Sequence, residues 1–473
     1  MSASNKLVIF QLDSCDYKFL KDNIGHFPNI QRLFGDRLEP LQTDQFAGST
    51  NTSFNTAKRA TDHGVYFQLQ WDPKTMRLRS LDPDWVGPLD PFWRTGKFSE
   101  RRGIILDPSF TFSGAGSCQL EIIGWSAHSS LVPFECNDAA LQQSIKSSYG
   151  VNLIGNETQL DRGIDERSKE RDAMIRSAHK RGALLRDLVT QRDWDFLYAV
   201  FSETHRGGHV LWPKEGVTPP DGLIDVYKAV DEGLGNVVEV LPENCEIIIF
   251  AVQGMGHQSA QGHLGRPLLE AALASLGCEV DKFRSRPNPV AWLRKTIPAR
   301  LQWEIRHRIP LRLRDRIVAR QYAGSIVPGE TIAFPLQSDN HGYWRFLIKG
   351  RDESGTLSAE EAEILRVGFG NILSEFKTAD GQALVSDVLY PASQEGDRAH
   401  LLPDVVAAWN PDIVPVAEAF HPTAGRVTGT PDLARTGNHR FRAFFGHSGP
   451  SALDADRPRH VADLPKFLQD FLD

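Results

Sequence analysis

The sequence predicts an α/β protein with a mainly parallel central sheet and helices on both of its faces. Short apolar runs typical of buried strands, "KLVIFQLD", "WDFLYAVFSE" and "EIIIFA", alternate with segments of helical pattern. A strand followed by a helix and another strand is the order that produces parallel sheets. The chain has 473 residues, of which 41% are hydrophobic and 24% are charged, so it can bury a large core.

The predicted elements follow in chain order. A strand opens the chain at 6–13, and "NIQRLFGDRL" is typical of the end of a short helix. The charged stretch 164–191 predicts a long helix before the strand "WDFLYAVFSE". Apolar residues at helical spacing over 223–241 predict a helix with one buried face, which leads into the strand at 246–251.

The last third of the chain contains further elements. "YWRFLIKG" predicts a strand, and "SAEEAEILRVGFGNILSEF" opens with the Ser-x-x-Glu pattern of a capping box and continues as a helix. The runs "PDVVAAW" and "FRAFFG" predict the last core strands.

An arginine-rich stretch at 281–320 interrupts this order, with apolar residues and prolines between its arginines. We therefore predict the first part of a catalytic core over 1–280, a helical insertion or cap over 281–335, and the second part of the core over 336–473. The insertion is interpreted as a helical cover of the core. A surface for an acidic substrate, a membrane or a partner is the alternative.

Bulk properties exclude several classes of function. The formal net charge of -7 provides no basic field for nucleic acid. No window approaches the roughly 20 apolar residues needed to span a bilayer. The start, "MSASNKLVIFQLD", has an apolar run too short for a secretory signal, and the five cysteines form no CxxC pair. We expect a cytoplasmic protein with reduced thiols.

Two candidate sites carry oxygen-bearing side chains. Asp13 ends the first strand, where a carboxylate can bind a metal or cap the next helix. The segment "AGSTNTSFNTAKRATDHG" places hydroxyl residues, among them Ser49 and Thr50, where a helix begins. Free N–H groups at a helix start stabilise an anion or an alkoxide, although simple capping is the commoner role of such residues.

Three histidines are the other candidates. His205 and His209 in "SETHRGGHVLW" are four residues apart, so on a helical turn they face one way and can share a metal. His439 in "TGNHRFRAFFGHSGP" precedes an apolar strand. The strand "EIIIFA" ends at Val252 and Gln253, neither of which is an acid or a strong metal ligand, although sheets of this kind present ligands at such ends.

The order of these motifs resembles that of the alkaline phosphatase superfamily, and more closely its type I phosphodiesterase/nucleotide pyrophosphatase branch. "LVIFQLDSCDYKFL" followed by "FPNIQRLF" is similar to that branch's opening strand and helix. "GYWRFLIKGRDESG" is similar to its R-x-N-x-x-G-R-x-x-x-G element, and "GNHR" to its final part. The resemblance covers nearly the whole chain and implies an alkaline-phosphatase-like fold with a two-metal site.

The resemblance assigns the first metal to His205, His209 and His439. The first of these stands where the family usually has Asp. Three imidazoles can hold a divalent transition metal tetrahedrally with one position open. Zinc is the first choice, and iron or manganese are alternatives.

The resemblance assigns the second metal to Asp13, the hydroxyl nucleophile and an Asp-His pair, but Val252 and Gln253 occupy the places of that pair. One carboxylate and one hydroxyl do not offset the repulsion between two dications about 4 Å apart. We therefore predict one ion, at the three-histidine site. Gln253 and His257 are candidate auxiliary ligands, and His263 is the alternative to His257.

Thr50 is the best match to the family's nucleophile, Ser49 is the second, and Asp13 is the candidate base. The main hypothesis is a divergent metal-dependent hydrolase or transferase, phosphodiesterase-like or sulfatase-like, acting on a small phosphorylated or sulfated molecule. One alternative is a repurposed single-metal enzyme of another class, including a redox enzyme of specialised biosynthesis. The other is a non-catalytic relative that binds a phosphorylated ligand.

Overall fold

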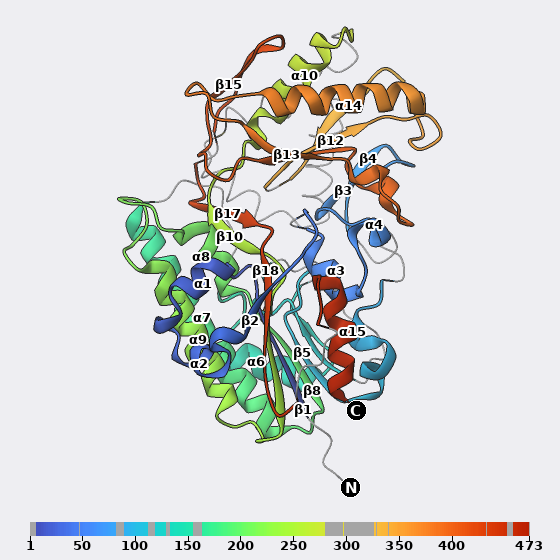
Figure 1. The fold of residues 1–473 in the computed structure, drawn as a ribbon. Coiled ribbons are helices and arrows are strands. Elements are labelled where there is room, and N and C mark those ends of the chain that lie inside the picture. Colours follow the sequence, from blue (N-terminus) through green and yellow to red (C-terminus); the bar gives the residue numbers. More distant parts are fainter. Residues whose placement is uncertain are drawn as a thin grey trace.

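The computed structural model describes residues 6–46, 48–81, 89–111, 119–128, 133–154, 163–279, 297, 326–327, 329–338, 340–431, 433–451 and 457–472. These residues form a large lobe around an eight-stranded sheet and a smaller lobe around a four-stranded sheet (Figure 1). The predicted arginine-rich insertion, apart from Ile297 and the residues from 326 on, lies outside the described residues. Across the described ranges, none of the helices combines the length and the apolar character needed to cross a bilayer.

The large sheet has the strand order β2-β18-β9-β1-β8-β5-β6-β7. Its strands are β1 (Lys6–Leu12), β2 (Leu38–Leu41), β5 (Gly103–Leu106), β6 (Leu120–Ile123), β7 (Glu135–Cys136), β8 (Phe196–Phe201), β9 (Cys245–Ala251) and β18 (Ala443–Ser448). The five strands from β9 to β6 are parallel to their neighbours, and β2, β18 and β7 are antiparallel additions at the two edges. The predicted mainly parallel sheet is confirmed.

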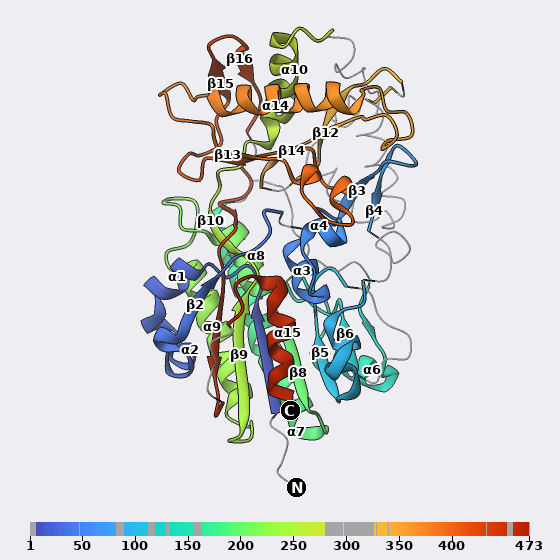
Figure 2. The ribbon, with the colours of Figure 1, turned by 45° about the vertical axis from the view of Figure 1, so that its right-hand side comes forward.

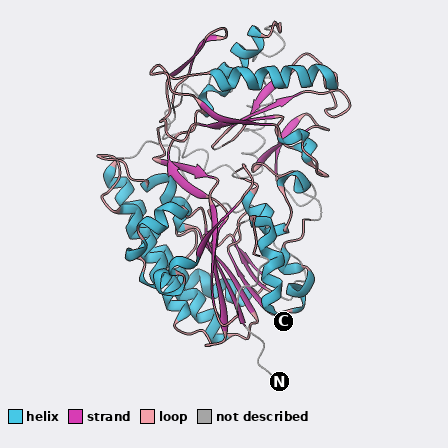
Figure 3. Cartoon of the chain, viewed as in Figure 1, coloured by secondary structure: helices cyan, strands magenta, loops and turns pink. Residues whose placement is uncertain are grey.

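Both faces of this sheet are covered by helices (Figures 2 and 3). In β1, Val8 and Phe10 face one apolar cluster, whereas Leu7 and Ile9 face another. This alternation follows from the period of two in a strand. Helices α1 (Tyr17–Asp22), α2 (Pro28–Leu33), α6 (Ala139–Ser148), α7 (Ile164–Gln191) and α9 (Gly222–Val238) contribute to the first cluster. Helices α3 (Thr50–Thr56) and α15 (Leu464–Leu468) contribute to the second.

The smaller lobe contains an antiparallel sheet of order β11-β12-β14-β13. Its elements are α10 (Gly265–Ser275), β11 (Ala333–Leu336), β12 (Gly342–Phe346), α14 (Ala359–Glu375), β13 (Val385–Leu389) and β14 (Val405–Trp409). Three further elements lie near this lobe: the short helix α4 (Ala60–His63), the hairpin β3 (Leu69–Asp72) and β4 (Arg77–Ser80), and the hairpin β15 (Glu418–His421) and β16 (Gly425–Thr428). The predicted capping box is present at Ser358 and Glu361 and begins α14.

The prediction that "PDVVAAW" and "FRAFFG" both belong to the main core is wrong for the first. That run forms β14 of the smaller sheet, and only β18 rejoins the large one. Val405 and Ala407 pack into one apolar cluster while Val406 packs into another, so both faces of β14 are covered. A strand buried on both faces reads as a continuous apolar run in either sheet, and its sequence does not say which.

A two-stranded ribbon connects the lobes. Strand β10 (Gly254–His257), just after β9, pairs antiparallel with β17 (Gly437–Arg440), just before β18, and this pairing sets Met255 opposite His439. The ribbon lies against α8 (Glu203–Leu211). A Cβ atom at Gly437 would lie 2.1 Å from the carbonyl oxygen of Gly208, so the close approach of ribbon and helix requires glycine there.

Candidate metal centre

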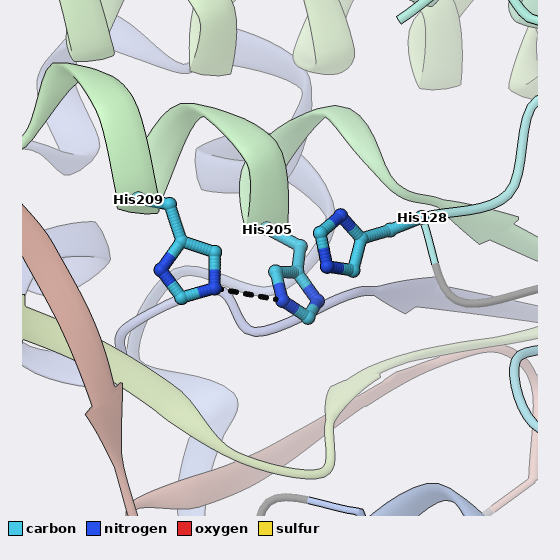
Figure 4. A group of neighbouring side chains, drawn as sticks. All are labelled: His128, His205 and His209. Carbon is cyan, nitrogen blue, oxygen red and sulfur yellow. Dashed lines mark hydrogen bonds between the residues drawn. The ribbon is translucent and has the colours of Figure 1, made fainter. Parts of the chain in front are cut away.

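Helix α8 begins directly after β8, at the carboxyl end of the parallel strands, and carries His205 and His209 one turn apart. Both side chains are buried, with 5% and 1% of their surface exposed. Their Nε2 atoms lie 3.2 Å apart (Figure 4). The two imidazoles expected to share a metal therefore point their ring edges at one place.

The other nitrogen of each ring fixes its tautomer. His205 Nδ1 lies 3.0 Å from Asp13 Oδ2, and His209 Nδ1 lies 3.1 Å from the carbonyl oxygen of Gly437. A carboxylate and a carbonyl oxygen only accept, so each Nδ1 carries a hydrogen and donates it. In the neutral rings, each Nε2 atom then carries a lone pair and no hydrogen, and the two lone pairs face each other. Such a pair is favourable only with a cation between them.

His439 decides which kind of cation fits. Its ring centroid lies 4.8 Å from those of both His205 and His209, and its side chain is 5% exposed. Its Nδ1 atom has no hydrogen-bond partner within the described part of the chain. A proton shared by His205 and His209 would leave this buried nitrogen unpaired, so a larger cation with room for a further ligand fits the three rings better. His439 nevertheless lies outside the set of histidines whose ring nitrogens are all within 4.8 Å of one another, which is His128, His205 and His209.

Electrostatics point the same way. Burial lowers the pKa of His209 well below its ordinary value, and the positive Arg435 nearby lowers it further. Burial and the neighbouring His205 do the same to the pKa of His439.

The spacing of the two Nε2 atoms also fits a metal ion. Two ligand nitrogens of a tetrahedral zinc ion, each 2.0–2.1 Å from the metal, are separated by about 3.4 Å. The observed 3.2 Å between the Nε2 atoms is close to that spacing.

A further imidazole, which the sequence analysis did not identify, belongs to this cluster. His128 lies in the loop after β6, and ring nitrogens of His128, His205 and His209 all lie within 4.8 Å of one another. Its ring stacks on that of His205, with centroids 3.6 Å apart and planes inclined by 27°. "GWSAHSS" contains no ligand pattern. The only sequence signal is a histidine just beyond a strand end.

Asp13 contacts the cluster from outside. It is fully buried at the end of β1, and its Oδ2 accepts from His205 while Oδ1 lies 3.4 Å from the hydroxyl of Ser14. Burial raises the pKa of this carboxyl, but attraction to the His205 imidazole and the hydrogen bond to it outweigh burial, so the pKa is lowered. A carboxylate behind a ligand histidine is the usual outer partner in metal sites.

The predicted second metal position is filled by a hydrogen-bond network. Thr50, the first residue of α3, donates from Oγ1 to Gln253 Oε1 at 3.2 Å. Gln253 in turn donates from Nε2 to the hydroxyl of Ser14 at 3.0 Å. Val252 is buried in an apolar cluster. Ser49 precedes α3 and donates to the carbonyl oxygen of Phe46 at 3.0 Å.

The remaining candidates have structural contacts. His257 ends β10, and its carbonyl oxygen accepts from Arg440 at 2.7 Å. Burial lowers the pKa of the His257 ring, with a further contribution from Arg440. The ring of His263 lies 2.7 Å from the carbonyl oxygen of Val416.

Comparison with known proteins agrees with the motifs. A family model described as type I phosphodiesterase / nucleotide pyrophosphatase matches residues 7–294. No curated protein sequence matches the chain.

Solved structures with similar folds include human ectonucleotide pyrophosphatase / phosphodiesterase 5, with 11% sequence identity and a TM-score of 0.50. That alignment covers 99% of this chain and 95% of the human one. Phosphonoacetate hydrolase from Sinorhizobium meliloti, solved with phosphonoformate, aligns with 12% identity and a TM-score of 0.49 over 99% of this chain and 96% of that one. At 11% identity, the likeness to the human structure concerns the fold alone. On the strength of the family match, the chain belongs to the type I phosphodiesterase / nucleotide pyrophosphatase family of the alkaline phosphatase superfamily.

Proposed function

We propose that this protein is a phosphodiesterase-like hydrolase or transferase that uses one divalent metal ion at its histidine cluster. Family membership supports a phosphoester hydrolase. The observation that carries the single-ion proposal is the pair of bare Nε2 atoms 3.2 Å apart, beside the orphaned Nδ1 of His439. His205, His209 and His439 are the proposed ligands, with zinc as the first choice and iron or manganese as alternatives.

When bound, such an ion supplies Lewis-acid polarisation of a phosphoryl or sulfuryl oxygen. The chain's own residues prepare the site for it. Asp13 accepts a hydrogen bond from Nδ1 of His205, and the carbonyl of Gly437 accepts one from Nδ1 of His209, so the Nε2 atom of each ring faces the proposed ion. The ribbon of β10 and β17 positions His439 against α8.

Thr50 is the proposed nucleophile. Its hydroxyl donates its hydrogen to the amide oxygen of Gln253. An amide oxygen orients a hydroxyl but does not take its proton, so Gln253 is a positioning residue and not a base. The carboxylate of Asp13 contacts His205 directly, and a chain of hydrogen bonds through Ser14 and Gln253 leads from it to Thr50, so we assign the carboxylate to His205.

The same contact favours a second candidate function. A hydroxyl that donates to a group of no basicity is poorly prepared for attack, whereas the histidine cluster keeps every feature of a metal site. A single-metal enzyme of another reaction class, including redox chemistry, is therefore the runner-up. A non-catalytic relative that binds a phosphorylated ligand is the third possibility.

Metal analysis combined with an ester assay separates these functions. Purified full-length protein is expected to contain about one equivalent of metal and to hydrolyse an aryl phosphodiester such as bis(4-nitrophenyl) phosphate. Thr50→Ala should abolish turnover and retain the metal. Thr56→Ala is the matched control, because this hydroxyl of the same helix donates to the carbonyl oxygen of Thr52.

Each other outcome contradicts part of the proposal. Full turnover by Thr50→Ala, lost instead in Ser49→Ala, would move the nucleophile to Ser49. Bound metal without turnover of phosphate or sulfate esters would favour the second function. Protein that binds phosphate but no metal would favour the third.

A further inference from the structure

We infer that His128 is an additional ligand of this ion, held against α8 by a buried network of Asp107, Arg181 and Glu203. The inference rests on the proposed metal site and extends it to a segment that no motif identified. The first support is position. His128 brings a ring nitrogen within 4.8 Å of those of His205 and His209, and it is the less buried of the three residues.

The second support is the way in which the loop before His128 is fixed. Asp107 follows β5, is fully buried and has a left-handed backbone with φ of 55°. Its Oδ1 accepts from the backbone N–H of Trp125 at 2.7 Å, and its Oδ2 from that of Ser126 at 2.9 Å. One carboxylate thus fixes two consecutive peptide units, the second of which lies two residues before His128.

The third support is a single guanidinium that connects this loop to α8. Arg181, fully buried on α7, donates to Asp107 Oδ2 at 2.8 Å and to the carbonyl oxygen of Ser126 at 2.9 Å. From Nε it donates to Glu203 at 3.2 Å. Glu203 begins α8, two residues before His205, and also accepts from Ser177 at 2.6 Å. The planar guanidinium therefore sets the distance between the two segments that carry the three histidines.

Stability alone is a weak reason for such a network. Taking three charges out of water is costly, and packed apolar residues often stabilise a core as well or better. A rigid set of charge-assisted bonds has another effect: it fixes geometry, which is what a ligand on a loop needs if it is to meet two ligands on a helix.

The stacking of His128 on His205 also fits simple aromatic packing, and a substitution can tell the two roles apart. Phenylalanine at 128 keeps a stacked ring and removes both nitrogens. We therefore compare wild-type, His128→Phe and His128→Ala full-length protein, each stripped of metal with a chelator. The readouts are zinc affinity by competition with a chromogenic chelator and the visible absorption spectrum of the cobalt(II) form. The matched control is His179→Phe, an exposed histidine of α7 bonded to Glu232.

If His128 is a ligand, His128→Phe and His128→Ala both lose zinc affinity by more than about 10-fold and alter the cobalt spectrum, while His179→Phe does neither. Wild-type affinity and an unchanged spectrum in His128→Phe would overturn the inference and leave the other three ligands standing. Wild-type protein that takes up no zinc or cobalt would overturn the metal site itself. Metal uptake without ester turnover would reject only the hydrolase function.

The network is tested by Arg181→Lys, which keeps a charge but cannot make the three bonds of the fork, and by Asp107→Asn, which keeps the shape. We expect each to lower zinc affinity about 10-fold and to alter the cobalt spectrum, with near-UV circular dichroism like that of the wild type in at least Asp107→Asn. Folded Asp107→Asn protein with wild-type affinity and spectrum would refute the positioning role.

Discussion

The two halves of the expected two-metal site differ in whether their polar atoms satisfy one another. Around His205, His209 and His439, lone pairs face each other and one buried nitrogen has no partner in the described chain. Around Thr50 and Gln253, the hydroxyl of Thr50 donates to the amide oxygen of Gln253, and the amide nitrogen of Gln253 donates to the hydroxyl of Ser14. For this reason we assign the proposed cation to the first half, whereas hydrogen bonds between neutral groups connect the residues of the second. Unsatisfied atoms therefore identify a binding site more directly than matching residue types do.

The largest expected effect comes from removing His209, a proposed ligand in the histidine cluster. His209→Ala should reduce zinc affinity by more than about 100-fold, which exceeds the usual cost of losing only an outer partner. The amount of zinc retained per chain after gel filtration measures this loss, with His179→Ala as the surface control. Retention of one equivalent of zinc by His209→Ala would show that the protein binds the ion at another place.

The second experiment restores the missing ligands of the other half, at Val252 and Gln253. Val252 is fully buried among apolar residues, and Asp there would be an unpaired buried carboxylate costing about 3 kcal/mol or more. With Gln253→His beside it, a second ion can neutralise that charge. The double variant should be strongly destabilised in chelator and regain more stability from zinc than the wild type does, as measured by urea unfolding.

The matched control for this experiment replaces Val252 by Asn, again with Gln253→His. The amide carries no charge, so zinc should restore much less of its stability. An equal zinc effect in the Asp and Asn variants would mean that the closed half cannot be reopened by charge alone.

A pH effect tests the scaffold of the closed half. His63 is buried, its Nδ1 accepts from the backbone of Val65, and its Nε2 lies 2.9 Å from the hydroxyl of Ser53 on the helix that carries Thr50. Burial lowers the pKa of His63 to about 3, with Arg398 and Lys58 adding to the effect. Because the unfolded chain then binds a proton below about pH 6.5 that the folded chain refuses, stability is complete above that pH and falls towards pH 3.

From pH 7 to pH 5 this histidine should therefore contribute a loss of about 2 kcal/mol in the free energy of unfolding. His63→Gln should be less stable at pH 7 but should show a shallower fall, as measured by urea unfolding at each pH. His26→Gln, in an exposed segment, should keep the wild-type slope. A slope unchanged by His63→Gln would mean that the ring is already protonated or already free in the folded state.

The smallest effect concerns the contact between ribbon and helix. In Gly437→Ala, a methyl group would meet the backbone of Gly208 at 2.1 Å, so β17 must move and carry His439 with it. We expect zinc affinity to fall about 10-fold. Gly262→Ala, where the added carbon meets no atom within 4 Å, is the control. Unchanged affinity in Gly437→Ala would argue that His439 is not a ligand.

Much of the fold could be predicted from the sequence because its signals are local. The buried strands, the long helix 164–191, the helix after Gly222 and the capping box at Ser358 each follow from composition and period within one segment. The sheet that β14 joins could not be predicted, since that depends on which face of which lobe covers it.

The site divides in the same way. The pair His205 and His209 is readable because a helix turn brings residues four apart together, and His439 was found through the family's order of motifs. His128 meets the cluster only through the carboxyl edge of the sheet and through the ion pairs of Arg181. Each of those contacts joins residues more than 50 positions apart, and no local pattern reports them.

The positions of the two ribbon strands in the sequence determine when the proposed metal site can form during synthesis. β10 ends at His257 and β17 begins at Gly437, so the whole smaller lobe is synthesised between two strands that are neighbours in space. On the ribosome, His128, His205 and His209 emerge long before His439 does. A nascent chain therefore carries only part of the proposed ligand set, and the proposed site can be completed only after the smaller lobe has been synthesised and the ribbon has formed.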